Sequence, residues 1–197
     1  MSRLRTFAAA DRVLADMHRW LERAVIGLNL CPFAKAVHVR GQIHWVVSTA
    51  ADTVALEDEL LRELEALAAA DPAVRDTTLL VVPQGLLDDF FLFHHFVRDA
   101  ERLLQRHGWE GVLQLASFHP DFQFADAPPD ALSHCTNRAP YPTLHLLREA
   151  SIDRAVQAFP DAEAIYGNNI RTLERLGAAG WQALGVGRSK PPAGEGP

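Results

Sequence analysis

The sequence contains few cysteines and no long apolar run. Its 197 residues include two cysteines, Cys31 and Cys135, which are too few for the disulfide framework of a small secreted domain. No apolar run approaches the roughly 20 residues that cross a bilayer, and the N-terminal segment MSRLRTFAAADR lacks the apolar core of a signal peptide. We therefore expect a cytoplasmic protein with reduced thiols and no membrane partner.

Clustered basic residues and nucleotide-binding motifs are also missing. The formal net charge is -6, and the lysines and arginines are scattered, whereas a nucleic-acid partner needs a concentrated positive face. The patterns GxGxxG, GxxxxGK[ST] and GxSxG do not occur, which disfavours classical nucleotide binding and a hydrolase serine. We expect no nucleic-acid partner and no cofactor.

The composition that remains is that of an ordinary globular domain. The chain is 48% hydrophobic and 22% charged, which is enough apolar surface for one core. We predict a single domain over residues 1–184. The glycine- and proline-rich segment 185–197 has no periodic apolar pattern and is predicted to be disordered.

Helices and strands are predicted to alternate along the first 118 residues. Apolar periodicity predicts helices over 11–28, 53–70 and 88–107, and strands over 43–48, 77–82 and 112–118. This order predicts an α/β fold with right-handed crossovers and a small, mainly parallel sheet of about three to four strands. Two further helices are predicted over 143–158 and about 161–176.

One arginine falls on the apolar side of the predicted helix 143–158. Leu144, Leu147 and Ile152 form the buried stripe, with Arg148 at its centre and His145 on its flank. A buried guanidinium keeps its charge, so it requires a carboxylate, several carbonyls or an anionic ligand. Two interpretations remain open at this stage. Arg148 is either a structural residue, paired with an acid or reaching past the helix end to water, or part of an anion clamp.

The loop before this helix supplies further candidate ligand-binding residues. Asn137, Arg138 and Tyr141 lie in a segment stiffened by Pro140 and Pro142, so their donors would be held in place before a ligand arrives. We assign Asn137, Arg138 and Tyr141, with Arg148, to substrate binding. A role in forming the turn explains the prolines equally well.

Three side chains are candidates for catalysis. His119 follows the strand 112–118, at the edge where α/β sheets bind ligands, and it is either an acid–base group or a hydrogen-bonded turn residue. His145 is a second acid–base candidate, and capping the helix or packing is its alternative role. Cys31, before Pro32, is a candidate nucleophile at the start of a short helix, although free cysteines are more often structural.

Zinc binding is an alternative role for the histidines and one cysteine. His119, His134, Cys135 and His145 are all ligand types that zinc prefers, but their spacings match no compact zinc motif. We therefore expect no metal.

Three segments carry a resemblance to a known family. With GLNLCPFA at 27–34, SFHPDFQF at 117–124 and NRAPYPTLHLLRE at 137–149, the chain resembles a bacterial family catalogued as a domain of unknown function, number 1415. The resemblance covers nearly the whole chain except the C-terminal tail. It implies a single cytosolic α/β domain and assigns no residue a role.

Two functional hypotheses follow from these residues. In the first, the protein is an enzyme acting on a phosphate or carboxylate metabolite, which Asn137, Arg138 and Arg148 hold while His119 or His145 moves a proton and Cys31 is the nucleophile. In the second, it is a non-catalytic binding or interaction protein, and the arginine and histidine cluster is a structural polar network.

Overall fold

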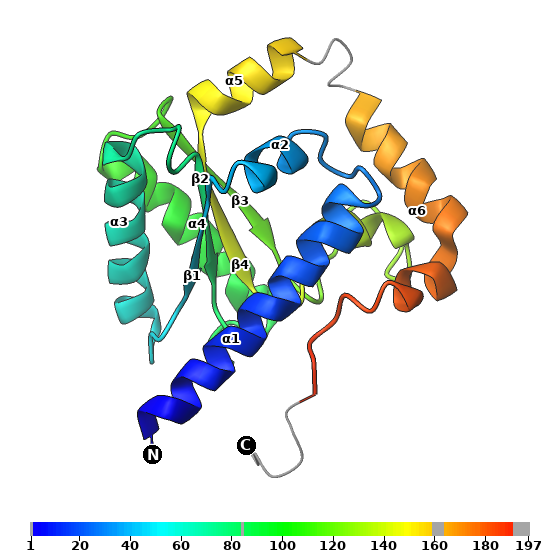
Figure 1. The fold of residues 1–197 in the computed structure, drawn as a ribbon, viewed down its shortest axis with the longest axis horizontal. Coiled ribbons are helices and arrows are strands. Elements are labelled where there is room, and N and C mark those ends of the chain that lie inside the picture. The colour runs from blue at the N-terminus through cyan, green and yellow to red at the C-terminus, as the bar shows by residue number, and fades with distance from the viewer. Residues whose placement is uncertain (1, 84, 159–163, 191–197) are drawn as a thin grey trace.

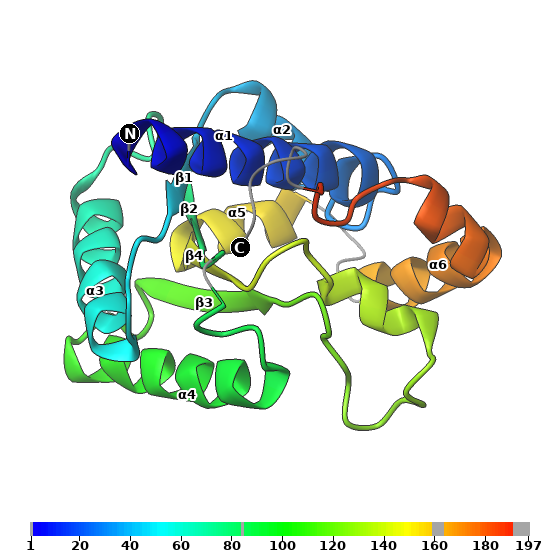
Figure 2. The same cartoon turned by 90° about the horizontal axis from the view of Figure 1, so that it is seen from below.

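The computed structural model describes residues 2–83, 85–158 and 164–190, and in it a four-stranded sheet lies between two layers of helices (Figures 1 and 2). The strands are β1 (Ile43–Val47), β2 (Thr77–Val81), β3 (Leu113–Phe118) and β4 (Thr143–Arg148). The helices are α1 (Ser2–Trp20), the π-helical turn η1 (Leu21–Ile26), α2 (Ala34–Val39), α3 (Thr53–Ala69), α4 (Phe90–Arg106), the 3-10 segment η2 (Leu132–Asn137), α5 (Glu149–Ala158) and α6 (Ala164–Ala183). No helix in the described part of the chain is both long and apolar enough to span a membrane.

The α/β class is confirmed, but the sheet is not mainly parallel. The strand order is β1-β2-β4-β3, and β4 pairs antiparallel with both β2 and β3. Only β1 and β2 pair in parallel among the described strands. The three strands expected from the alternation do run in the same direction, because β2 and β3 are both antiparallel to β4. The fourth strand is inserted between them, and this changes the pairing.

The predicted helix over 143–158 is wrong in its first six residues. Residues 143–148 form β4, and the helix α5 begins at Glu149. Leu144 and Leu146 are fully buried on one face of the sheet, while His145 alternates to the other face. The leucines of TLHLLR fit both a helical and a strand period, and hydrogen bonding to β2 and β3 on both sides decides for the strand.

The helices α3 and α4 cover one face of the sheet. Asp52 and Asp89 cap these helices by accepting from the backbone N–H of Ala55 (2.8 Å) and Leu92 (2.9 Å). The core on this face joins both helices to the sheet; its largest buried side chains include Leu56, Leu60, Leu64, Phe93, Leu80, Leu144 and Leu146.

The helix α1 crosses the opposite face (Figure 2). Met17, Trp20 and Leu21 form a second apolar cluster there with Val81. The α2 segment lies beside this cluster (Figure 1). This second layer contains the cavity described below.

The C-terminal part of the chain packs along one side of this arrangement. The helix α6 contacts η2 through Leu173 and Cys135, and the chain bends at Gly177, whose φ is 69°. The first residues of the helix predicted over 161–176 lie outside the described residues, as do residues 191–197 of the predicted tail. Residues 185–190 of that tail are described, and they hydrogen bond to α1.

Candidate functional site

A cavity of about 710 Å³ lies on the face of the sheet that carries His145. Its floor comes from alternate residues of β2, β3 and β4, and its walls come from η1, the α2 segment and α5. Most of its lining is apolar; the larger side chains are Trp20, Leu21, Phe33, Ile43, Leu79, Phe118, Leu147 and Ile152. Ligand sites in proteins are typically apolar cavities of about 300–1,000 Å³ with a few polar groups.

Two of the three catalytic candidates line this cavity. Cys31 is half-buried in the turn between η1 and α2. His145 lies in the middle of β4, between Leu79 of β2 and Ala116 of β3. The cavity therefore brings together residues more than a hundred positions apart in the sequence.

The hydrogen bonds of His145 define its chemical state. Thr77 Oγ1 donates to the carbonyl oxygen of Leu146 (2.6 Å) and lies 2.7 Å from His145 Nε2. A hydroxyl has one proton, so Nε2 carries the hydrogen of this contact and Nδ1 is an acceptor. No described residue hydrogen bonds to Nδ1 of His145. Among the described residues, the only buried side-chain polar atom without a partner is Arg148 Nε, so Nδ1 of His145 is not buried. It is therefore open to the cavity.

Burial lowers the pKa of His145 to about 4. The imidazole is half-buried at the cavity floor and surrounded by protein, where the charged form is poorly solvated. It is therefore neutral at pH 7. An anion bound in the cavity would favour the imidazolium and raise this pKa.

Two arginines line the cavity and are exposed, so they lie at its mouth. Arg40 Nε donates to Gln42 Oε1 (2.6 Å), and its Nη atoms make no hydrogen bond to a described residue. Arg154 Nη2 donates to Ser151 Oγ (2.9 Å) and lies 4.0 Å from Asp76 Oδ1. With one carboxylate against two guanidinium groups, the mouth has a net positive charge.

Arg148 does not line this cavity, because it shares the opposite sheet face with Leu144 and Leu146. Its Nη2 donates to the carbonyl oxygens of Leu67 and Ala70 at the end of α3, the latter at 2.6 Å, and to that of Arg75 at 3.3 Å. The last carbonyls of a helix lack intrahelical partners and attract cations. Carbonyl oxygens, rather than an acid, thus bind the guanidinium of this half-buried arginine.

The other predicted substrate-binding residues lie at the far edge of the sheet from Arg148. Arg138 Nε donates to the carbonyl of Phe122 (3.2 Å), and Asn137 Nδ2 to that of Ser117 (3.5 Å). Tyr141 donates its hydroxyl proton to Asp16 Oδ2 (2.8 Å). β4 separates Arg138 from Arg148, so the two arginines do not converge on one site.

His119 is fully buried at the end of β3 and is not in the cavity. Its Nδ1 accepts from the backbone N–H of Asp121 (3.0 Å), and its Nε2 donates to the carbonyl of Leu87 (3.0 Å). Its ring lies against Phe90 and Phe93, and burial lowers its pKa. This environment matches the alternative of a hydrogen-bonded turn residue.

The four residues weighed for zinc do not meet. His134 uses both ring nitrogens, accepting from the N–H of Phe124 and donating to the carbonyl of Pro128. Cys135 is buried against Leu173, and burial raises the pKa of its thiol. No group of three histidine, cysteine, aspartate or glutamate side chains in the described ranges is arranged to hold a metal ion.

Several cavity residues have no signal in the sequence. Arg40 and Arg154 are single arginines in polar surroundings, and Thr77 is the first residue of an apolar strand. Cys31 and His145 are the cavity residues that the sequence indicated as candidates, by residue type. A strand over 143–148 in place of a helix would also have put His145 on the sheet face opposite Leu144 and Leu146, because side chains alternate along a strand.

Comparison with curated proteins and with solved structures gives no match for this chain. A family model described as "Protein of unknown function (DUF1415)" matches residues 12–183. That range includes the whole sheet and every residue that lines the cavity. The chain therefore belongs to the DUF1415 family, as its three sequence segments predicted.

Proposed function

We propose that this protein is an enzyme for a small molecule with an apolar body and one anionic group, bound in the sheet-face cavity. The observation that carries the proposal is the cavity itself, which holds Cys31 and His145 within an apolar lining and has two arginines at its mouth. The anionic metabolite expected from the sequence is kept. Its binding groups become Arg40 and Arg154 in place of Arg138 and Arg148.

The lining supports an amphiphilic ligand over a compact polar one. Trp20, Phe33 and Phe118 offer aromatic surface inside the cavity, and burying apolar area releases about 25 cal/mol for each Å². Arg40 and Arg154 lie where a carboxylate or phosphate would remain partly hydrated. A guanidinium binds either group through two parallel hydrogen bonds.

The chemistry of the two inner residues supports a reaction on the bound molecule. The thiol of Cys31 is the candidate nucleophile, and Nδ1 of His145 is an open acceptor that could take up a proton. In the protein without a ligand, the low pKa of His145 makes it a weak base at pH 7. A bound anion would raise that pKa, so the base would become effective only in the complex.

A non-catalytic binding protein is the second candidate, and the environment of His145 favours it. A neutral imidazole held by Thr77 at 2.7 Å can serve as a fixed hydrogen-bonding group for a ligand without exchanging a proton. In that case Cys31 would be part of the lining alone.

The binding step is tested by thermal unfolding against a matched ligand series. Octanoate and octyl phosphate should raise the unfolding midpoint of the purified protein. Octanol should not, because it lacks the anionic group, and acetate and inorganic phosphate should not, because they lack the long apolar chain. Replacing both arginines (Arg40→Gln, Arg154→Gln) should weaken octanoate binding at least tenfold. Arg98→Gln, an exposed arginine on α4, is the matched control. Equal shifts for octanol and octanoate would contradict the anionic part of the proposal.

The catalytic step is tested on the molecules that bind. Cys31→Ser should keep the thermal shift and abolish turnover of a monothioester or activated monoester of suberate, whose second carboxylate stays free to bind the arginines, since a hydroxyl is a much weaker nucleophile than a thiol. Binding without turnover in the wild-type protein would support the second candidate.

A further inference from the structure

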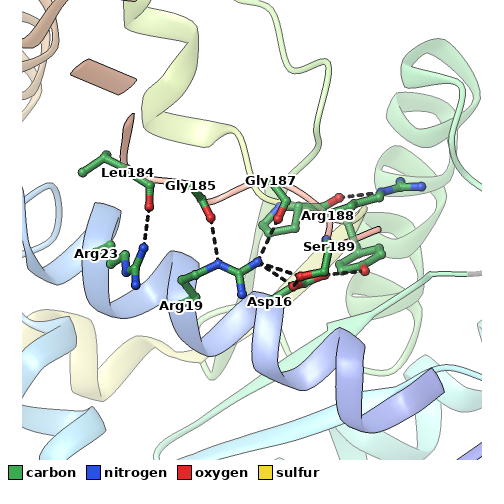
Figure 3. Close-up of polar contacts among 10 residues, drawn as sticks. Asp16, Arg19, Arg23, Leu184, Gly185, Gly187, Arg188 and Ser189 are labelled. Carbon is green, nitrogen blue, oxygen red and sulfur yellow. Dashed lines mark hydrogen bonds and ion pairs between the residues drawn. The ribbon is translucent and has the colours of Figure 1, made fainter. Parts of the chain in front are cut away.

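The segment Leu184–Ser189 follows α6 and runs alongside α1 (Figures 1 and 3). Its backbone is held by two arginines of the first helical layer. Arg23 Nη1 donates to the carbonyl of Leu184 (3.0 Å), and Arg19 donates to those of Gly185 (2.7 Å) and Gly187 (3.1 Å). These three contacts recognise the backbone and are independent of the side chains of the segment.

A buried carboxylate binds the end of the segment. Asp16 is fully buried and accepts from the backbone N–H of Ser189 (2.8 Å) and from its hydroxyl (2.5 Å). The same carboxylate accepts from Tyr141 Oη (2.8 Å) and Arg19 Nη2 (2.5 Å). Burial alone would raise the pKa of Asp16, but these hydrogen bonds outweigh it and the pKa lies below its usual value. Asp16 is therefore ionised and fully engaged while the segment is docked.

Two further side chains of the segment have dedicated contacts. Val186 is buried in the apolar cluster with Val13 and Met17 of α1. Arg188 lies 4.8 Å from the ring centre of Tyr141, donates to the carbonyl of Pro140 (2.7 Å) and pairs with Asp88 (2.8 Å). We call the surface that makes these contacts the groove; it is formed by Val13, Asp16, Met17, Arg19, Arg23, Asp88, Pro140 and Tyr141. The groove contacts the side chains of the valine, the arginine and the serine in the sequence Val-Gly-Arg-Ser.

The family model matches the residues that form this groove but not the segment that fills it. Asp16, Arg19, Arg23, Asp88 and Tyr141 all fall within the matched residues 12–183, whereas Leu184–Ser189 lies beyond them. The residues that bind the segment therefore lie in the part of the chain that the family model matches, and the segment itself lies outside that part.

We propose that this groove is a peptide-docking site, occupied here by the chain's own residues 184–189, and that a partner docks through an extended segment of the pattern apolar-Gly-Arg-Ser. Arginines that bind backbone carbonyls, combined with pockets for alternate side chains, form a general mode of peptide recognition. The tethered segment competes at the high effective concentration of a short connection, on the order of millimolar. A partner gains access when that segment is displaced.

The test uses the full chain with its own segment weakened. Arg188→Ala with Ser189→Ala removes the polar side-chain contacts of the segment, keeps Val186 and leaves the groove intact. Hydrogen exchange of residues 184–190 should become fast in this double variant and remain slow in the wild type. A fluorescein-labelled peptide LGVGRSK should then bind the double variant at least tenfold more tightly than the wild type, as measured by fluorescence anisotropy.

Matched variants assign the binding to the groove. Adding Asp16→Asn or Arg19→Gln to the double variant should weaken peptide binding at least tenfold, whereas Asp11→Asn, an exposed carboxylate on the same helix, should leave it unchanged. The peptide LGVGAAK, which lacks the arginine and the serine, should bind at least tenfold more weakly.

Three results would overturn the proposal. The first is slow hydrogen exchange of residues 184–190 in the double variant, because the contacts of Arg188 and Ser189 would then not be what holds the segment in place. The second is a released segment with no peptide binding, and the third is equal binding of both peptides. Dimers of the double variant that vanish on adding LGVGRSK would identify a second copy of the chain as an occupant and would support the site.

Discussion

Arg148 Nη2 donates a 2.6 Å hydrogen bond to the carbonyl oxygen of Ala70, the residue that ends α3. The donor stands on the last residue of β4, 78 positions further along the chain. One guanidinium thus joins the end of a central strand to the end of a covering helix. The arginine that looks misplaced among leucines in the sequence is a helix cap supplied by another element.

Replacing this cap should destabilise the fold. We expect Arg148→Met to lower the free energy of unfolding by about 2–4 kcal/mol, because buried carbonyls lose a charged donor. Urea unfolding measures the change, and Arg98→Met, on the exposed face of α4, should change it by less than about 0.5 kcal/mol. An Arg148→Met protein as stable as the wild type, with weaker octanoate binding, would instead show that Arg148 binds the anion.

The buried imidazole should make stability depend on pH. The folded pKa of His145 is about 4 against an ordinary value of 6.5, so between these values the unfolded chain binds more protons than the folded one. Stability should therefore fall as the pH drops from 6.5 to 4, by roughly 3 kcal/mol at most from this group.

Unfolding midpoints measured at pH 7 and pH 4.5 test this dependence. His145→Gln should reduce the difference between the two conditions, while His94→Gln, on the exposed side of α4, should leave it as in the wild type. If His145→Gln keeps the full difference, the imidazole is not buried in its neutral form.

The two thiols should differ in reactivity. Cys31 is half-buried and faces the cavity, whereas Cys135 is 3% exposed and burial raises the pKa of its thiol. A thiol reagent such as dithionitrobenzoate should therefore modify one cysteine in the folded protein and both in urea. Cys31→Ser should remove the fast reaction, and octanoate should slow it in the wild type. Fast reaction of Cys135 in the Cys31→Ser protein would contradict this assignment.

Docking of the C-terminal segment should be sensitive to acid. The folded pKa of Asp16 lies below its ordinary value of 3.8, so its contribution is fully present above about pH 4 and is lost as the pH falls through the lowered folded pKa. Hydrogen exchange of residues 184–190, corrected for the intrinsic rate, should show protection at pH 5 that decreases below pH 3.5. In Asp16→Asn the protection should be weaker and independent of pH over this range.

The elements of this fold could be predicted where a segment fits one period alone. The helix over residues 90–106 places Phe93, Phe96 and Ala100 on one buried side, and the strand over 77–81 is buried throughout. TLHLLR fits two periods, and its local sequence does not contain the pairing with β2 and β3 that selects the strand. Because this segment was predicted as a helix, the antiparallel strand β4 between β2 and β3 was missed, and Arg148 was placed on a helix instead of at the end of a strand.

The candidate site shows the same division. The sequence singled out Cys31 and His145 by residue type, but it also singled out His119, which the fold buries in a hydrogen-bonded turn. Arg40 and Arg154 had no local signal, because an exposed arginine gains a role only from the cavity that opens beside it.

The family, the α/β class and most of the helices and strands follow from the sequence, because these depend on motifs and on the periodic burial of apolar side chains. Tertiary structure alone decided which face each polar side chain occupies. Strand order and helix packing bring Cys31 and His145 to one cavity, Arg148 to the end of α3 and Ser189 to Asp16. Such contacts join residues far apart in the chain, and no local pattern encodes them.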